Sequence, residues 1–337
     1  MTSIEKHLTP QPLVDSFGRR HTNLRVSVTD RCNIRCFYCM PESVVFKPRD
    51  EILTFDEIER FVRAIVPAGV TKLRVTGGEP LVRKDLDVLV ANLASIEGVT
   101  DLAMTTNGVL LAQHAKALYE AGLQRLNISI DGLSEETFQQ ITRRDGLGKV
   151  IEGIDAACEL PFQQVRLNAI AIRDLTEAEV LPLARFAFER KLELRFIEFM
   201  PLDADANWQT DQVLSGREIQ QMLESEFGLA VPVPRNDPSQ PATDFSFANG
   251  GRVGFINSVT QPFCKNCNRL RITAEGKVRN CLFSTTEWDA RSLLRSNASD
   301  SEIARLVRDC VQAKQRGHGI DSDSFERPER AMYQIGG

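Results

Sequence analysis

Strand-like and helix-like segments alternate along the chain as far as Met200, and this alternation limits the fold. One helical segment begins with the capping box Thr54-Phe55-Asp56-Glu57 and extends to about Ala68. Others are predicted at Leu110–Ala121 and after a second capping box, Thr176-Glu177-Ala178-Glu179. Strands joined through helices pair in parallel, with right-handed crossovers. We therefore predict an α/β fold, an incomplete (β/α)6 TIM-like barrel, with strands at Leu24–Val28, Lys72–Thr76, Asp101–Thr106, Arg125–Ile130, Gln164–Ile172 and Glu193–Phe199.

The alternation ends at Met200-Pro201. Residues 202–214 are polar and irregular, a helix is predicted at Ser215–Phe227, and the segment from Val231 to Pro241 is rich in proline. Such a composition is typical of a linker or a covering loop. We predict a partial barrel in residues 1–230 and a smaller C-terminal iron-sulfur domain in residues 231–337, which closes the mouth of the barrel.

Six of the eight cysteines form two triplets, each one thiolate short of the four that a cubane iron-sulfur cluster takes. Cys32, Cys36 and Cys39 form the first, with C-x3-C-x2-C spacing. Three protein ligands leave one iron open to another molecule.

Structural zinc is less favoured, because a closed zinc site takes four protein ligands. Disulfides are disfavoured too, since cysteine is sparse and residues 1–17 resemble no signal peptide, so we expect a cytoplasmic protein.

Paired glycines follow the predicted strand Lys72–Thr76. Gly77 and Gly78 carry no side chain, which lets backbone come close to a ligand. Ligands of parallel α/β sheets collect at the carboxyl ends of strands. Since the first cysteine triplet also follows a strand, Leu24–Val28, we expect both loops at the same rim.

The second triplet, Cys264, Cys267 and Cys281, lies beside an Arg-x-Arg pair. If the chain continues from Cys267 as a strand, Arg269 and Arg271 project from one face, because side chains alternate along a strand. Two guanidinium groups beside an open iron suit a polyanion, and phosphate is the natural partner. We predict a second cluster here, which helps to hold the small domain together.

Length and charge limit the class of protein further. The chain has 337 residues, of which 42% are hydrophobic, enough for a barrel of about 200 to 250 residues and a smaller domain. The net charge of -5 at pH 7 disfavours nucleic acid and anionic membranes as partners, because both attract clustered positive charge. No apolar run reaches the roughly 20 residues that a membrane-spanning helix needs.

The first triplet, with Tyr38 directly before its last cysteine, resembles that of radical S-adenosylmethionine (SAM) enzymes. Thr76-Gly77-Gly78-Glu79-Pro80 resembles the Gly-Gly-Glu-Pro segment of the same superfamily. Over nearly the whole chain, the order of motifs is similar to that of the GTP 3′,8-cyclase (MoaA) family of molybdenum-cofactor biosynthesis. The further segments that carry this resemblance are Thr105-Thr106-Asn107-Gly108, Asn127-Ile128-Ser129-Ile130-Asp131-Gly132, Phe196-Ile197-Glu198-Phe199-Met200-Pro201, the second triplet with its Arg-x-Arg pair, and Gly336-Gly337.

The resemblance implies two 4Fe-4S clusters and S-adenosyl-L-methionine as cofactors. The first cysteine triplet would hold the cluster that cleaves the cofactor, and the open iron of the second cluster would bind the guanine of GTP. The cofactor-binding positions that it implies are Tyr38, Gly77, Gly78, Glu79, Ser129 and Met200. The substrate-binding positions are Arg25, Arg74, Thr105, Arg166, Arg195, Arg269, Leu270 and Arg271, and the catalytic positions are Arg25, Arg269, Arg271, Gly336 and Gly337. Arg166 stands where relatives often have lysine, so a planar guanidinium group replaces a compact ammonium group.

The reaction implied by the resemblance is that of a radical SAM lyase. Reductive cleavage of the cofactor gives a 5′-deoxyadenosyl radical, which abstracts the C3′ hydrogen of GTP. C3′ then bonds to C8 and gives (8S)-3′,8-cyclo-7,8-dihydroguanosine 5′-triphosphate, an early intermediate of molybdopterin synthesis. The implied partners are GTP, an electron donor such as flavodoxin or ferredoxin, a second copy in a homodimer, and the cyclic pyranopterin monophosphate synthase that receives the product.

Two alternatives stay open. A radical SAM peptide-maturing enzyme with an auxiliary cluster would share the barrel and the first triplet, but such auxiliary domains usually carry more than three cysteines and no Arg-x-Arg pair. A non-enzymatic iron-sulfur sensor would not need the glycine loop.

Cys158 and Cys310 are predicted to be small buried hydrophobes. Composition alone predicts a frayed end at the terminal glycines, whereas the resemblance implies that they reach the active site.

Overall fold

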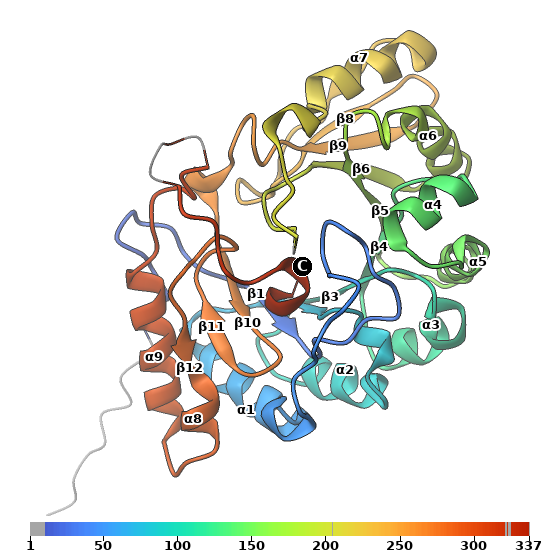
Figure 1. Ribbon diagram of the computed structural model, residues 1–337. Helices are drawn as coiled ribbons and strands as arrows, with labels where there is room; N and C mark the ends of the chain where they lie inside the picture. Colours follow the sequence, from blue (N-terminus) through green and yellow to red (C-terminus); the bar gives the residue numbers. More distant parts are fainter. Residues whose placement is uncertain (1–10, 204, 321, 323–324, 337) are drawn as a thin grey trace, which may run out of the picture.

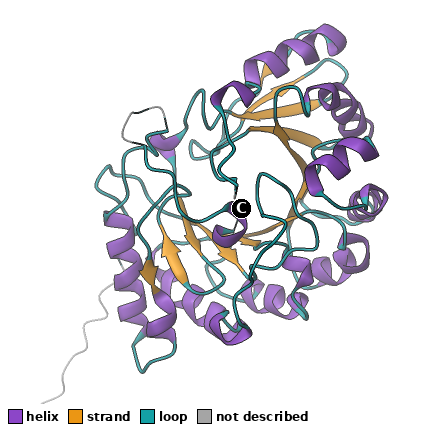
Figure 2. Ribbon diagram, in the orientation of Figure 1, coloured by secondary structure: helices purple, strands orange, loops and turns teal. Residues whose placement is uncertain are grey.

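The computed structural model describes residues 11–203, 205–320, 322 and 325–336. Its strands curve around a central space, and most of its helices lie outside the sheet (Figure 1, Figure 2). Six neighbouring strands follow one another in chain order and pair in parallel, which confirms the predicted α/β partial barrel. They are β1 (Asn23–Ser27), β2 (Lys72–Thr76), β3 (Asp101–Thr106), β4 (Arg125–Ser129), β5 (Gln164–Ala171) and β6 (Glu193–Glu198).

The C-terminal region adds strands to both edges of this sheet. β9 (Arg252–Ile256) pairs in parallel with β6, and β10 (Arg269–Ile272) pairs in parallel with β1. Antiparallel strands extend the edges further: β8 (Thr243–Ser246) and β7 (Val231–Pro232) beyond β9, and β11 (Lys277–Arg279) and β12 (Trp288–Asp289) beyond β10. A single twelve-stranded sheet thus spans both predicted parts of the chain, and the boundary at residue 230 stays a prediction.

Amphipathic helices cover the outer face of the sheet. α1 begins after Thr54, whose hydroxyl accepts the amide hydrogen of Glu57 (3.1 Å), while the Glu57 carboxylate accepts the amide hydrogen of Thr54 (2.7 Å), as the capping box predicts. The helix then buries Ile58, Phe61 and Val62 against the core. The helices of this layer are α1 (Phe55–Ile65), α2 (Leu86–Ala94), α3 (Leu111–Glu120), α4 (Glu135–Thr142), α5 (Leu147–Cys158), α6 (Val180–Glu189) and α7 (Gly216–Phe227).

The predicted capping box at Thr176 is wrong. A short 3-10 turn at Glu177–Glu179 precedes α6, and the Thr176 hydroxyl accepts the amide hydrogen of Ile172 (2.8 Å) instead of capping a helix. The carboxylate of Glu179 accepts the amide hydrogen of Leu133 (2.7 Å). The Thr176 hydroxyl thus bonds to a residue four positions earlier and Glu179 to a distant loop, in place of the helix cap that the motif predicts.

The C-terminal helices lie in two places. α8 (Ala290–Leu294) and α9 (Asp300–Gln312) pack near α1 on the outside, where Arg60 donates to the carbonyl oxygens of Leu294 (3.2 Å) and Ala298. The short α10 (Met332–Ile335) lies at the centre of the barrel mouth (Figure 1). The C-terminal region therefore closes the mouth through its last helix.

The two remaining cysteines differ in their surroundings. Cys310 is buried on α9, as predicted, whereas Cys158 is exposed at the end of α5, so the prediction of a buried residue is wrong there. Among the described helices, none is long and apolar enough to cross a bilayer.

Candidate active site

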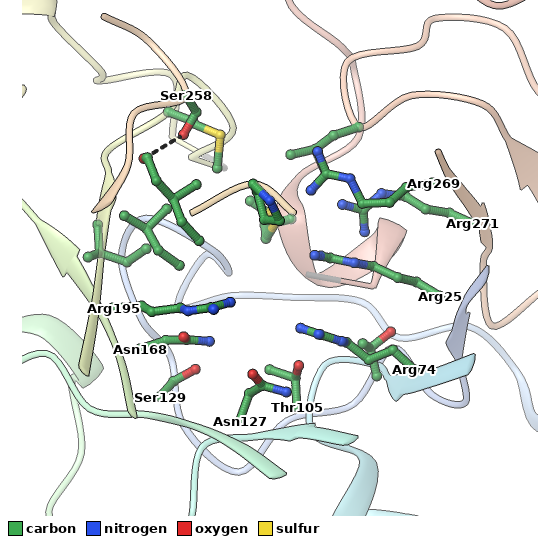
Figure 3. A pocket seen from close by; sticks show the side chains of 18 of the residues that line it. Arg25, Arg74, Thr105, Asn127, Ser129, Asn168, Arg195, Ser258, Arg269 and Arg271 are labelled. Carbon is green, nitrogen blue, oxygen red and sulfur yellow. Dashed lines mark hydrogen bonds between the residues drawn. The ribbon is translucent and has the colours of Figure 1, made fainter. Parts of the chain in front are cut away.

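The inner face of the sheet surrounds a cavity of about 390 Å³. On β1, Leu24 and Val26 are buried in the core, and Arg25 between them faces the cavity, because successive side chains of a strand point to opposite faces. The strand register places Arg25 beside Arg74 of β2 and beside Arg271 of β10. Figure 3 shows these guanidinium groups, together with that of Arg269, on one side of the cavity.

Within the described residues, the arginine row Arg25, Arg74 and Arg271 pairs with no carboxylate. Burial lowers the pKa of all three, and neighbouring guanidinium groups lower it further. For Arg271, burial and the charge of Arg269 lower the pKa to about 9. Since guanidinium groups keep their charge, a bound polyanion would relieve this repulsion and would accept several charge-assisted hydrogen bonds. The charge on this wall of the cavity therefore suits an anionic ligand.

Arg166 and Arg195, also predicted to bind substrate, line the same cavity but have acidic partners. Both pair with Glu193, at 2.9 Å and 2.6 Å, and Arg195 lies 3.6 Å from Asp244. Their charges are thus largely neutralised. Arg195 projects from the side opposite Arg25 and Arg74, with Asn168, Ser129, Asn127 and Thr105 along the floor between them (Figure 3).

The first cysteine triplet lies in the loop after β1, and all three of its members line the cavity. The glycine loop after β2 holds it: Gly78 donates its amide hydrogen to Thr29 (2.7 Å), and Glu79 donates to Arg31 (2.8 Å). A Cβ atom on Gly77 would lie 2.7 Å from the Thr29 carbonyl oxygen, and one on Gly78 would lie 2.5 Å from that of Arg31. Both glycines line the cavity. The backbone that comes too close to them for a side chain, however, is that of the cysteine loop.

Two buried carboxylates support this rim. Glu79 accepts from the Thr106 hydroxyl (2.7 Å) and from the Asn107 amide hydrogen (2.7 Å), and burial raises its pKa to about 7. The Tyr38 hydroxyl donates to Asp131 (2.6 Å), whose pKa burial raises to about 6. Tyr38, Glu79 and Met200, which the sequence analysis predicts to bind the cofactor, line the cavity.

The polar cavity residues that the sequence analysis does not predict include Asn127, Asp131 and Asn168. Asn127 lies two residues before Ser129 on β4 and so points to the same face, and Asp131 lies two residues after Ser129, just beyond the end of the strand. That alternation could have identified them. Asn168 lies beside Ser129 in the strand register, a relationship that only the fold supplies.

The second cysteine triplet lies at the same cavity. Cys264 is in the 3-10 turn Cys264–Asn266, Cys267 precedes β10, and Cys281 follows β11. Burial raises the pKa of Cys267, but the charges of Arg269 and Lys314 outweigh it and lower that pKa to about 6. In the first triplet, burial raises the pKa of Cys32 to about 11, so metal binding there must release a proton.

The number of thiols in each triplet fits an iron-sulfur cluster with one open iron. Within the described part of the chain, no three histidine, cysteine or acidic side chains are close enough to hold one metal ion. A closed zinc site takes four protein ligands, whereas a cubane cluster held by three cysteines keeps one iron open to another molecule. Both triplets therefore suit iron-sulfur clusters.

The C-terminal tail reaches this cavity. Arg271 donates to the carbonyl oxygen of Gly336 (2.5 Å), and Gly336 has a φ of 70°. A Cβ atom on Gly336 would lie 2.6 Å from the Thr76 hydroxyl oxygen. Before it, Tyr333 packs with Met40 and the first triplet, and Ile335 packs near Cys281. The tail thus spans both triplets, while Gly337 lies outside the described residues.

The side chain of one predicted substrate residue, Leu270, points away from the cavity. The side chain of Leu270 is fully buried in the hydrophobic core, on the face of β10 opposite Arg269 and Arg271. A side-chain contact between Leu270 and a ligand in the cavity is therefore excluded, and only its backbone remains for such a contact.

Comparisons with known proteins agree with this architecture. The family model of the radical SAM superfamily matches residues 26–187. The fold is similar to that of Streptococcus suis SuiB (TM-score 0.60, 13% identity, 94% of this chain and 77% of that chain). It is also similar to that of anSMEcpe with bound AdoMet (TM-score 0.54, 16% identity, 92% and 93%). The fold and the cysteine loop after β1 define the chain as a radical SAM enzyme.

The C-terminal region and full-length relatives narrow this class. The family model Molybdenum Cofactor Synthesis C matches residues 192–320. The GTP 3',8-cyclase of Rhodopirellula baltica is 53% identical, over 97% of this chain and 93% of its own length. That of Paenarthrobacter nicotinovorans is 44% identical, over 96% and 97%. The chain belongs to the GTP 3′,8-cyclase family.

Proposed function

We propose that this protein converts GTP into (8S)-3′,8-cyclo-7,8-dihydroguanosine 5′-triphosphate with the help of S-adenosyl-L-methionine and two 4Fe-4S clusters. The observation that carries the proposal is the arginine row, which pairs with no carboxylate of the described residues and lines one cavity together with both cysteine triplets. Family membership supports the same reaction.

The arginines would bind and orient the triphosphate. Arg25, Arg74 and Arg271 come from three adjacent strands, so their guanidinium groups are held by the sheet rather than by mobile loops. Fixing a substrate on a rigid scaffold lowers the entropic cost of reaching the reactive geometry. Arg269, on the same face of β10, adds a fourth donor.

The two triplets would hold two clusters with different roles. Cys32, Cys36 and Cys39 would hold the cluster that binds and cleaves the cofactor, and Cys264, Cys267 and Cys281 would hold a second cluster beside the guanine. When bound, the first cluster and the cofactor supply the one-electron chemistry that removes the C3′ hydrogen. The barrel wall and the tail would shield this chemistry from water and from other hydrogen donors.

Other roles follow the same proposal. Tyr38, Gly77, Gly78, Ser129 and Met200 would contact the cofactor, since all of them line the cavity near the first triplet or at the ends of the barrel strands. An electron donor such as flavodoxin or ferredoxin, a homodimeric assembly, a cytoplasmic location and transfer of the product to the cyclic pyranopterin monophosphate synthase complete the proposal.

Anaerobic reconstitution followed by turnover tests this function. With GTP, S-adenosyl-L-methionine and a reductant, we expect methionine, 5′-deoxyadenosine and the cyclised triphosphate in equal amounts. Guanosine, which lacks the triphosphate, should be a poor substrate. Cofactor cleavage without cyclised product, or equal turnover of GTP and guanosine, would contradict the proposal.

A further inference from the structure

A buried lysine lies behind the second cysteine triplet. Lys314 follows the end of α9, and only 5% of it is exposed. Its ammonium group donates to three acceptors: the carbonyl oxygen of Asn280 (2.6 Å), that of Arg269 (3.0 Å) and the sulfur of Cys267 (3.6 Å). An ammonium group has three hydrogens, so these contacts use its whole donor capacity.

The charge of Lys314 has few negative neighbours. Two of its acceptors are neutral carbonyls, and in the described part of the chain no carboxylate forms an ion pair with it. The groups near it that can carry negative charge include the thiol groups of Cys267 and Cys281, while Arg269 and Arg19 add positive charge. A buried charge without a partner is costly. A metal-bound thiolate, which stays anionic, would be a permanent partner.

The contacts of Lys314 also connect the ligand loops. Asn280 directly precedes Cys281, and Arg269 lies two residues after Cys267, so one ammonium group joins the backbone beside two ligands. The third ligand is tied to the same segment. Arg19 donates to the carbonyl oxygen of Cys264 (2.8 Å) and to that of Gln315 (2.7 Å), the residue after Lys314.

We propose that Lys314 is a positioning residue of the second cluster, which holds the loops of Cys267 and Cys281 and raises the reduction potential of the cluster by balancing its charge. This inference rests on the proposal that the second triplet holds a cluster. Hydrogen bonds to cluster sulfurs and nearby charges are known to set such potentials, because reduction adds negative charge that a buried cation stabilises.

The test uses the full-length chain with Cys32, Cys36 and Cys39 changed to alanine, so that any remaining cluster is the second one. Iron content and an EPR-monitored redox titration are compared among this parent, Lys314→Gln, Lys314→Arg and Lys265→Gln. Lys265 is the matched control, because it lies between Cys264 and Cys267 in sequence but is exposed. Its charge is screened by water.

We expect Lys314→Gln to retain less iron and to shift the potential to more negative values, whereas Lys314→Arg and Lys265→Gln keep the parental potential. An unchanged potential and iron content in Lys314→Gln would overturn the inference. If circular dichroism shows that Lys314→Gln does not fold, the decision rests on Lys314→Arg, which keeps the positive charge. A reduction potential equal to that of the parent supports the charge effect. A shift of the potential to more negative values in Lys314→Arg contradicts it. Absence of iron from the parent would instead overturn the proposed second cluster.

Discussion

At the scale of single residues, the arginine row distinguishes this cavity from an ordinary barrel interior. Arg25, Arg74 and Arg271 lie side by side on neighbouring strands, and burial and mutual repulsion lower the pKa of each. Arg166 and Arg195, across the cavity, share Glu193 and therefore contribute less net charge. The electrostatic attraction for a polyanion is thus concentrated on one wall.

Changing Arg269 or Arg271 to alanine should weaken GTP binding by roughly 1.5 to 3 kcal/mol, the range for hydrogen bonds to charged groups. Guanosine lacks the phosphates, so its binding should change little. Equilibrium binding of both ligands to the reconstituted enzyme checks this expectation. Equal losses for GTP and guanosine would show that the substitution damages the fold rather than a triphosphate contact.

Glu79 should make the stability of the protein depend on pH. Burial raises its pKa from 4.5 to about 7, so between these values the folded state holds a proton that the unfolded state releases. The free energy of unfolding must then fall as the pH rises through this window, by about 3 kcal/mol at most. Glutamine cannot ionise and lacks this dependence.

The stability advantage of the wild type over Glu79→Gln should accordingly shrink from about pH 5 to about pH 8. Urea unfolding of both proteins, at matched pH values, measures it. An advantage that grows with pH would mean that the carboxylate is better stabilised in the folded protein than in water, and would contradict a desolvated Glu79.

At the scale of secondary-structure elements, sequence patterns predicted the six central strands closely. They failed where tertiary contacts decide: the Thr176 capping box gave way to bonds with neighbouring loops, and Cys158 at the end of α5 is exposed. The sequence also contained no signal that β9 and β10 would extend the barrel sheet, since that pairing joins residues far apart in the chain.

The residues of the site likewise divide into those that sequence patterns predict and those that only the fold identifies. Motif spacing and strand alternation predicted the cysteine triplets, the paired glycines after β2 and the pair Arg269 and Arg271, whereas Arg25 and Arg74 were predicted from the family resemblance. Lys314 could not, because a single lysine after a helix has no pattern of its own and its partners come from β10 and from the loop before Cys281. Leu270 was assigned to the substrate although the alternation of β10, which aligns Arg269 with Arg271, turns its side chain to the core.

The terminal element should serve the reaction rather than the fold. Gly336 accepts a hydrogen bond from Arg271, and its backbone conformation and close contact with Thr76 leave no room for a side chain. Deleting Gly336 and Gly337 should leave iron content, melting temperature and cofactor cleavage nearly unchanged while cyclisation of GTP collapses. Product analysis of the truncated enzyme tests this expectation. Full cyclisation would show that the terminal glycines have no role in the reaction.

At the scale of the whole molecule, one sheet brings together two cysteine triplets that lie far apart in the sequence. The first follows β1, the second flanks β10 and β11, and the pairing of β10 with β1 places both on one cavity. α10 then packs against residues of both triplets. The architecture thus brings the proposed site of cofactor cleavage and the proposed site of the anionic substrate to one cavity.

The two triplets should be separable by mutation. Changing Cys32, Cys36 and Cys39 to alanine should remove about half of the iron and abolish formation of 5′-deoxyadenosine, because each triplet would hold one cluster. Changing Cys264, Cys267 and Cys281 should remove the other half and weaken GTP binding, with some cofactor cleavage retained. Iron analysis and product assays measure both. A first-triplet variant that still forms 5′-deoxyadenosine would refute the assignment.

The central claim is that the cavity places C3′ of GTP beside the cofactor bound at the first triplet. Turnover of GTP carrying deuterium at C3′ tests it most directly, with mass spectrometry of the 5′-deoxyadenosine formed. The account predicts that one deuterium moves from GTP into 5′-deoxyadenosine for each cyclised product. Cyclised product accompanied by unlabelled 5′-deoxyadenosine would contradict it.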